Sequence, residues 1–499
     1  MAIALILLLF YPHRKLRQVL DKFHCNETAT RHKAIDWLAP AALMLICWLP
    51  FIALVWPGSL CQDYLYQLAQ ANGLTQLSSH HPILSTFIFG LLFRLGYFFN
   101  NANGGIGITV ILQTIIMLVV FALMVGWLTR LGLPRAFKYA ILAICCFWPI
   151  FPMYAQWCVK DTLSASFIAL FCIQVFVRER YTRSTEHIPR VPLIARLPVM
   201  GLVGLLSALL RNNNIFIILP AILLLRPSET AFRRHHLLLV ASILAFCVLW
   251  YGPLTNVLGA KGGSIREALC LPTQQIARYI HNHPNEITEE DRNLMRMLSS
   301  TPPEKIALLY DPEFTDPVKN VLTIDERSQL YAYIKLWARL GTRDFLTYIK
   351  AWLHMSYGYW YPAHLNRWDL SEIARCDDWS IEWGNDFFKL NYGSFLLDSG
   401  KSLYPVGRKG LNNIICEMAK IPVVGLIMQP GLFGIITILI SLYQLFRKHG
   451  SWSLMVMGLL TVMICSASPV NGSMRYALPL VPILFLQIAS VASPAKETD

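Results

Sequence analysis

Charged residues are scarce in this sequence. Asp, Glu, Lys and Arg make up 15% of its 499 residues, whereas soluble globular proteins carry about a quarter. Hydrophobic residues make up 55% and the mean hydropathy is +0.45, so an ordinary soluble enzyme is excluded. Repeated apolar runs of about 20 residues match the ~30 Å hydrocarbon core of a bilayer. The sequence therefore predicts an all-α polytopic membrane protein whose first partner is the lipid bilayer.

Several sequence motifs are also missing. There is no Walker-type phosphate loop, no GxGxxG after a strand and no GxSxG elbow, so ATP-driven transport, nicotinamide chemistry and hydrolase chemistry have no motif here. The twelve cysteines form no CxxC pair and no Cys/His spacing suited to zinc. They are either small packing residues or, on the outer side of the membrane, candidates for disulfides. The outer candidates are Cys61, Cys158, Cys270, Cys376 and Cys416.

The apolar runs and the basic loops between them predict ten membrane spans, with both termini cytoplasmic. The spans cover residues 38–57, 105–128, 136–155, 162–178, 192–210, 214–226, 236–254, 421–446, 452–468 and 474–492. Residues 1–37 form a cytoplasmic basic tail and 493–499 a second cytoplasmic tail. This topology follows the positive-inside rule, because basic residues such as Arg130, Arg135 and Lys138 fall in the loops placed inside. We therefore expect a multi-pass plasma-membrane protein.

Two long segments are expected on the outer face. The first outer loop covers 58–104, and within it the apolar segment 82–99, interrupted by Arg94, is expected to lie against the membrane rather than cross it. Residues 255–420 form an extracytoplasmic domain, with helical spacing over Ile265–Ile280 and Glu326–His354.

The position of the positive charge excludes nucleic acid as a partner. The segment 255–420 holds 19 basic and 20 acidic residues, whereas the rest of the chain holds 24 basic and 10 acidic residues. The net charge of +13 thus belongs to the loops of a membrane protein rather than to a nucleic-acid surface.

Polar residues that could carry chemistry lie at the outer ends of the spans. Asp63 is the one acidic residue of the first outer loop. It is either a solvated or helix-capping carboxylate, or a general base fixed at the membrane surface. His80 and His81 could donate to a phosphate or ligate a metal, and an ordinary turn explains them equally well.

Three further loops supply cations on the same side. Lys160 precedes Asp161, which is a helix cap in one interpretation and a ligand for a divalent cation or an acceptor in the other. Arg211 precedes Asn212, and Arg475 with Tyr476 opens the last span. Each arginine either extends to the lipid interface or, together with Lys160, binds phosphate.

The expected outer domain offers weaker candidates. Gln274 and Gln275 could read the polar groups of a ligand, or belong to the surface of an amphipathic helix. The aromatic residues of 352–392 fit an interfacial belt, although some could stack on sugar rings. Asn471-Gly472-Ser473 is formally a glycosylation acceptor beside the membrane.

This arrangement resembles the GT-C superfamily of integral-membrane glycosyltransferases, in particular the protein O-mannosyltransferase and aminoarabinose transferase type. It resembles more closely an uncharacterised group of bacterial cell-envelope membrane proteins. Three features carry the resemblance: Asp63 just after the first span, Asp161 at the next outer loop, and Arg475-Tyr476 followed by Pro479 at a late span. Asp63 is followed by Tyr64 where many relatives have a second acid, a departure that leaves a two-carboxylate metal site without support.

The resemblance implies inverting transfer of a sugar from a polyprenyl-phosphate donor to an acceptor on the outer face, the acceptor being a glycan, teichoic acid, lipid or protein. Asp63 would deprotonate the acceptor, and Lys160, Arg211 and Arg475 would neutralise the departing phosphate. Asp161 would position the acceptor or a divalent cation such as Mg²⁺ or Mn²⁺, although no metal site is assigned. Two alternatives stay open: a transporter or flippase of lipid-linked sugars, and a noncatalytic envelope-assembly subunit.

Overall fold

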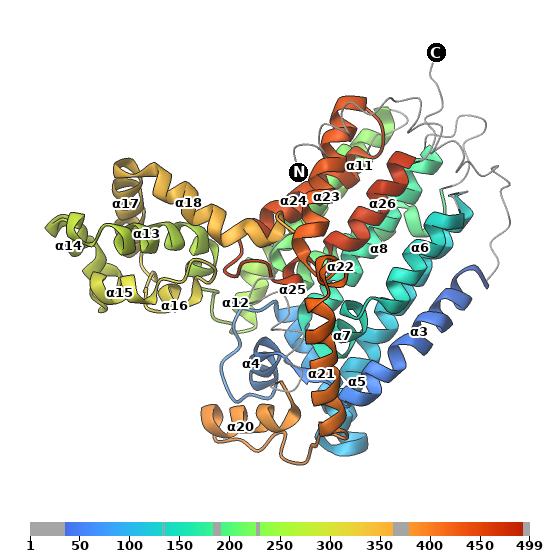
Figure 1. The fold of residues 1–499 in the computed structure, drawn as a ribbon, viewed down its shortest axis with the longest axis horizontal. Coiled ribbons are helices and arrows are strands. Elements are labelled where there is room, and N and C mark those ends of the chain that lie inside the picture. The colour runs from blue at the N-terminus through green and yellow to red at the C-terminus, as the bar shows by residue number, and fades with distance from the viewer. Residues whose placement is uncertain are drawn as a thin grey trace.

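The computed structural model describes residues 35–131, 133, 135–182, 191–225, 230–362 and 379–492. Most of the expected tail 1–37 and all of the tail 493–499 lie outside these residues. Figure 1 shows two bodies, a large helical bundle and a smaller helical domain at its side.

The bundle is formed by both ends of the described chain. Its first helices are α3 (Ile35–Val55), α5 (Ile83–Arg130), α6 (Arg135–Phe147), α7 (Ile150–Gln156), α8 (Lys160–Thr182), α9 (Leu197–Leu210), α10 (Ile215–Leu224) and α11 (Thr230–Leu249). Its last helices are α23 (Pro430–Arg447), α24 (Trp452–Ser466), α25 (Met474–Ala477) and α26 (Leu480–Ala492). The shorter turns η1 (Leu193–Ala195), η2 (Asn212–Asn214), η3 (Trp250–Leu254) and α12 (Thr255–Val257) extend them.

These helices confirm a polytopic membrane protein. Six helices of the described chain are long and apolar enough to cross a membrane, and the bent pair α6 and α7 would make a seventh. Three shorter apolar helices, at Leu197–Leu210, Asn212–Leu224 and Trp452–Ser466, occupy the other expected segments. All ten expected segments thus contain helices, while the number of ten spans stays a prediction.

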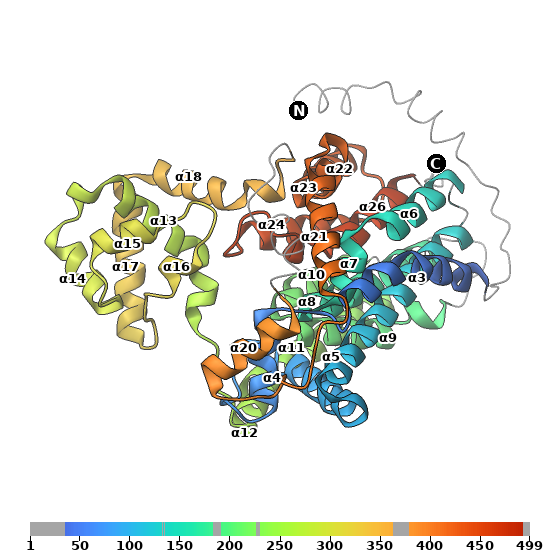
Figure 2. The same ribbon diagram turned by 60° about the horizontal axis from the view of Figure 1, so that its bottom comes forward.

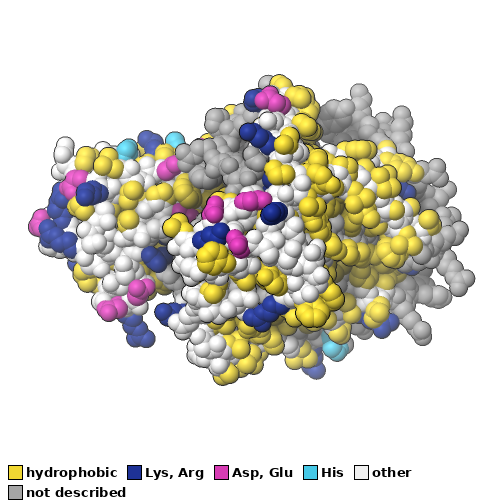
Figure 3. Space-filling view, turned by 90° about the horizontal axis from the view of Figure 1, so that it is seen from below, with side chains coloured by type: hydrophobic (Ala, Val, Ile, Leu, Met, Phe, Trp, Pro, Cys, Tyr) yellow, Lys and Arg dark blue, Asp and Glu magenta, His cyan; other side chains and the backbone are white. Residues whose placement is uncertain are grey.

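Burial separates the centre of the bundle from its rim. The apolar windows of α8 and of the helical stretch Met474–Ala492 are 83% buried, whereas those of α3 and of the helical stretch Arg234–Val257 are only 17% buried. A helix that exposes most of its apolar surface needs an apolar solvent around it. Figure 3 shows hydrophobic side chains gathered over the bundle, which fits a surface that faces lipid.

The long helix α5 is two arms joined at a sharp corner. Asn100 and Asn101 leave helical geometry, and Asn101 has a φ of 48°. A Cβ on Gly96 would lie 2.0 Å from the carbonyl oxygen of Gly104, so only glycine allows the arms to meet this closely. The first arm, Ile83–Phe99, is thereby separated from the arm that contains the expected span 105–128.

The smaller body, which we call the small domain, consists of α13–α18. These helices are α13 (Cys270–Asn282), α14 (Glu289–Leu298), α15 (Pro303–Leu309), α16 (Asp316–Lys319), α17 (Arg327–Arg343) and α18 (Phe345–Ser356), with η4 (Ile265–Leu269) and η5 (Pro284–Glu286) before and between them. The small domain has its own hydrophobic core, built from residues between Ile276 and Tyr348. The helical spacing predicted for 265–280 and 326–354 is confirmed.

The remaining helices of 255–420 pack on the bundle instead. After η6 (Tyr357–Tyr359), the segment contains α20 (Ile381–Tyr392) and α21 (Pro405–Lys420), and α22 (Pro422–Ile427) follows it at the start of the expected span 421–446. Helix α20 packs against α4 (Gln62–Ala71), and α21 packs against α3, as Figures 1 and 2 show. The segment expected to form the outer domain therefore contributes to both bodies.

Candidate functional site

Two short parallel strands bring distant parts of the chain into register. β1 (Ser59–Leu60) pairs with β2 (Trp157–Cys158), with Ser59 opposite Trp157 and Leu60 opposite Cys158. Helix α4 begins two residues after β1, and α8 begins two residues after β2. The pairing therefore places Asp63 and Asp161 at equivalent positions, each in the first turn of its helix.

Asp63 is held by two cations. Its carboxylate pairs with the Nζ of Lys160 at 2.5 Å and with the guanidinium of Arg475. Burial alone would raise the pKa of Asp63, but the charges of Arg475 and Lys160 outweigh it and hold that pKa well below its usual range. Asp63 is therefore ionised at neutral pH.

Asp161 is held by two arginines. One carboxylate oxygen lies 2.8 Å from Arg211 and the other 2.5 Å from the Nε of Arg475. The side chain of Asp161 is only 1% exposed, so its charge depends on these partners rather than on water. Arg475 thus bridges the two aspartates.

Asp63, Lys160, Asp161, Arg211 and Arg475 make up what we call the charged cluster. The two guanidinium groups also lie over the Tyr476 ring, 4.9 Å from its centre for Arg211 and 5.7 Å for Arg475. Three cations against two carboxylates leave a formal charge of +1. The amino-terminal ends of α4 and α8, which carry a partial positive charge, lie at the same place. The arrangement suits an anion with more than one negative oxygen.

Buried polar side chains fix the strands that carry the cluster. Arg408 of α21 is fully buried and donates to the carbonyl oxygens of Val55 and Gly58 and to the hydroxyl of Ser59. The side-chain oxygen of Gln156 accepts from the Ser59 amide at 2.8 Å. These contacts connect α3, α21 and β1 into one support for Asp63.

The loop before Arg475 is held by the turn at the end of α18. The Tyr359 hydroxyl, which is buried, donates to the carbonyl of Val470 and accepts from the amide of Ser473. The side-chain oxygen of Asn471 accepts from the Gly358 amide at 2.8 Å. Asn471 is fully buried, so the formal glycosylation acceptor is not available to an enzyme in this fold.

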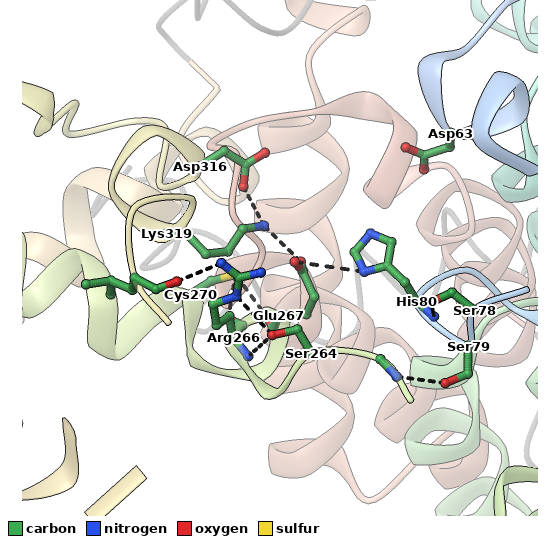
Figure 4. Close-up of polar contacts among 12 residues, drawn as sticks. Asp63, Ser78, Ser79, His80, Ser264, Arg266, Glu267, Cys270, Asp316 and Lys319 are labelled. Atoms are coloured by element: carbon green, nitrogen blue, oxygen red, sulfur yellow. Dashed lines mark hydrogen bonds and ion pairs between the residues drawn. The ribbon is translucent and has the colours of Figure 1, made fainter. Parts of the chain in front are cut away.

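Of the two histidines, His81 lies on the side of the charged cluster and His80 on the side of the small domain. His81 is buried, and its burial lowers its pKa to about 3, so its ring is neutral at neutral pH. The Nδ1 of His80 lies 4.0 Å from Glu267, whose carboxylate pairs with Lys319 at 2.8 Å. Figure 4 shows His80 between Glu267 and Asp63. The first loop also pairs with residues before η4 through a bridge of Ser78 to Lys261.

Three predicted residues make their contacts outside the cluster. The Asn212 side chain accepts from the Tyr251 hydroxyl at 2.8 Å. Gln274 is buried and donates to the carbonyl of Asp311, and Gln275 accepts from the Trp337 indole at 2.7 Å. Gln274 and Gln275 therefore serve the packing of the small domain.

The charged cluster is not arranged as a metal site. In the described part of the chain, no three His, Cys, Asp or Glu side chains gather where they could hold an ion. Both oxygens of Asp161 pair with arginines, so that carboxylate is not set up as a metal ligand. Of the cysteines expected outside, Cys61, Cys158, Cys270 and Cys416 are free thiols, and Cys376 lies outside the described residues.

The similarity of the turns around Asp63 and Asp161 was not predicted from the sequence. Gln62-Asp63-Tyr64-Leu65 and Lys160-Asp161-Thr162-Leu163 occupy matching positions after paired strands. The shared Asp-x-Leu pattern was the available signal, although it is short. Arg408 was also missed, because nothing in its own segment indicates burial beside residues 350 positions away.

The comparison with known families covers almost the whole chain. Residues 34–498 match the family described as "Family of unknown function (DUF6020)", and the chain belongs to that family. No curated protein and no solved structure matches the chain.

Proposed function

We propose that this DUF6020 member is a membrane glycosyltransferase of GT-C type that moves a sugar from a polyprenyl-phosphate donor to a cell-envelope acceptor on the outer face of a bacterial plasma membrane. The observation that carries the proposal is the charged cluster itself. Lys160 at the start of α8, Arg211 between α9 and η2, and Arg475 in α25 converge beside the two carboxylates with which they pair. Cations placed in this way stabilise the charge that grows on a departing phosphate.

The phosphate of the donor would replace the carboxylates as counter-ion. Without a bound donor, the positive charges of Lys160 and Arg475 are paired with the carboxylate of Asp63. A phosphate that enters between these cations draws part of that charge away, so the pKa of Asp63 rises toward its usual value and its carboxylate becomes a better base. Asp63 would thereby become an effective base only when a phosphate occupies the charged cluster.

The residues of the charged cluster can then supply the proton transfer and the charge stabilisation that the transfer step needs. Asp63 takes the proton of the acceptor hydroxyl, whose oxygen forms a bond to the anomeric carbon. The bond from that carbon to the phosphate oxygen breaks, and its electron pair stays with the phosphate, where Arg475 and Lys160 offset the charge. Attack opposite the leaving group inverts the anomeric centre. Asp161 holds Arg211 and Arg475 in place.

The location of the cluster supports a lipid-linked donor. Lys160 begins α8 and Arg475 lies at the start of the last apolar helix, Met474–Ala492, both of which are long enough to span a membrane. A phosphate at that depth is within reach of a carrier whose chain remains in the lipid. The fully soluble sugar nucleotides lack this advantage.

The experiment that tests the proposal follows bond cleavage and movement separately. Purified protein in vesicles is given a panel of polyprenyl-phosphate sugars with a labelled sugar, and transfer to envelope acceptors and donor hydrolysis are measured together. Transfer supports the glycosyltransferase. Movement of carriers between leaflets without cleavage of the sugar–phosphate bond would instead favour the flippase, and neither activity would favour an envelope-assembly subunit.

A further inference from the structure

Helix α18 carries an exposed apolar face that no part of the described chain covers. Its exposed side chains are Phe345 (68% exposed), Leu346 (57%), Ile349 (37%) and Trp352 (38%). At 100° per residue these four positions fall within one arc of about 120°. The opposite side of the helix, with Thr347 and Ala351, is buried, and Tyr348 beside it belongs to the core of the small domain.

The ends of α18 are fixed, so this face is held in one orientation. Asp344 caps the helix by accepting from the amide of Thr347 at 3.0 Å. At the other end α18 packs against α24 and continues into η6. Figures 1 and 2 both show α18 running from the small domain to the bundle.

The composition of the face fits a lipid surface. It combines Phe and Trp with aliphatic residues, which is typical of side chains that settle at the boundary of headgroups and acyl chains. Helix α18 contains no acidic residue, and its exposed Lys350 flanks the apolar arc. Lys350 is thus placed to pair with an anionic headgroup beside the apolar arc.

Helix α18 also packs on a bundle helix that has exposed apolar surface of its own. Helix α24, on which α18 packs, exposes Met463 (64%) in its last turn. Because the bundle is surrounded by lipid, a helix that packs on α24 starts close to the lipid boundary. We infer that Phe345, Leu346, Ile349 and Trp352 of α18 rest on the bilayer surface and hold the small domain against the membrane.

Depth-dependent quenching in vesicles tests this inference, independently of any enzymatic activity. Single cysteines carrying a fluorophore are placed by Leu346→Cys and Ile349→Cys in full-length protein whose accessible native cysteines are replaced by serine. The protein is reconstituted in phosphatidylcholine and phosphatidylglycerol with nitroxide-labelled lipid. Leu308→Cys is the matched control, because Leu308 is 85% exposed on α15, along the lower edge of the small domain in Figure 1.

We expect lipid nitroxides to quench both α18 labels several-fold more than the label at 308, and iodide in the water to quench them less. Two results would overturn the inference. Equal access of iodide to all three labels means that the α18 face is in water. Protection from iodide without quenching by lipid nitroxides means that a protein surface, such as a second copy of the chain, covers it.

Discussion

Arg475→Gln tests whether the charged cluster is a real energetic unit. Arg475 is 10% exposed and pairs with Asp161, which is 1% exposed, and with Asp63. Removal of one partner from a buried ion pair costs about 3–5 kcal/mol, because the other charge stays buried without compensation. In this variant Asp161 still pairs with Arg211, and Asp63 still pairs with Lys160. We therefore expect a loss of unfolding free energy at the lower end of this range, about 3 kcal/mol.

The assay is equilibrium unfolding in mixed micelles, followed by tryptophan fluorescence. Asp161→Asn and the double variant complete a cycle, and we expect a coupling free energy of about 1–3 kcal/mol between the two positions. Lys420→Gln is the control, because Lys420 pairs with Glu417 at the exposed surface and its loss should leave stability unchanged. An unfolding free energy of Arg475→Gln equal to that of the wild type, or strictly additive effects in the cycle, would refute the reasoning.

The remaining predictions concern pH, packing and the support of the first strand. Because the pKa of Asp63 is depressed in the fold, its ion pairs stabilise the protein fully above about pH 5, and this stabilisation is lost progressively as the pH falls through about 4 and below. In unfolding measured from pH 7 to about pH 3, Asp63→Asn should therefore lose less stability than the wild type, and parallel curves would contradict the pairing. Gly96→Ala should destabilise the protein by about 1–3 kcal/mol, because the new Cβ meets the backbone of Gly104. Gly410→Ala is the control and should not destabilise it, because nothing lies within 4 Å of a Cβ there. Equal thermal stability of the two variants would contradict the close approach of the two arms of α5. Arg408→Met should cost about 2–4 kcal/mol in the mixed-micelle assay, since the carbonyls of Val55 at the end of α3 and of Gly58 lose a buried charged donor; an unchanged midpoint would show that the junction of α3 and β1 does not depend on Arg408.

The membrane class and the main members of the site were open to prediction because each leaves a local signal. An apolar run of about 20 residues identifies a span by itself. Asp161 and Arg475 are charges at the ends of spans, where charge is costly, and Asp63 is the one acidic residue of the first outer loop, so each stands out without knowledge of its neighbours. Their common location follows once the outer ends of the spans are assigned to one side.

The contacts that build the site were beyond the sequence. The ion pair of Arg475 with Asp63 joins positions 412 residues apart, and the pairing of β1 with β2 involves only two residues in each strand. Neither a contact between residues so far apart in the chain nor a pairing of two residues per strand leaves a periodic pattern in the sequence. The division of 255–420 between the small domain and the bundle was hidden for a related reason, since amphipathic helices such as α20 show an apolar face without showing what covers it.

The measurement that tests the central claim most directly is sugar transfer by the wild type, Asp63→Asn and a matched variant, Asp398→Asn. Asp398 is an exposed acidic residue paired with Lys389, so its variant controls for the loss of a carboxylate as such. We expect Asp63→Asn to bind the donor but to transfer sugar about 10²–10⁴-fold more slowly, and Asp398→Asn to transfer at the wild-type rate. Undiminished transfer by a folded Asp63→Asn protein would contradict the role of Asp63 as the base.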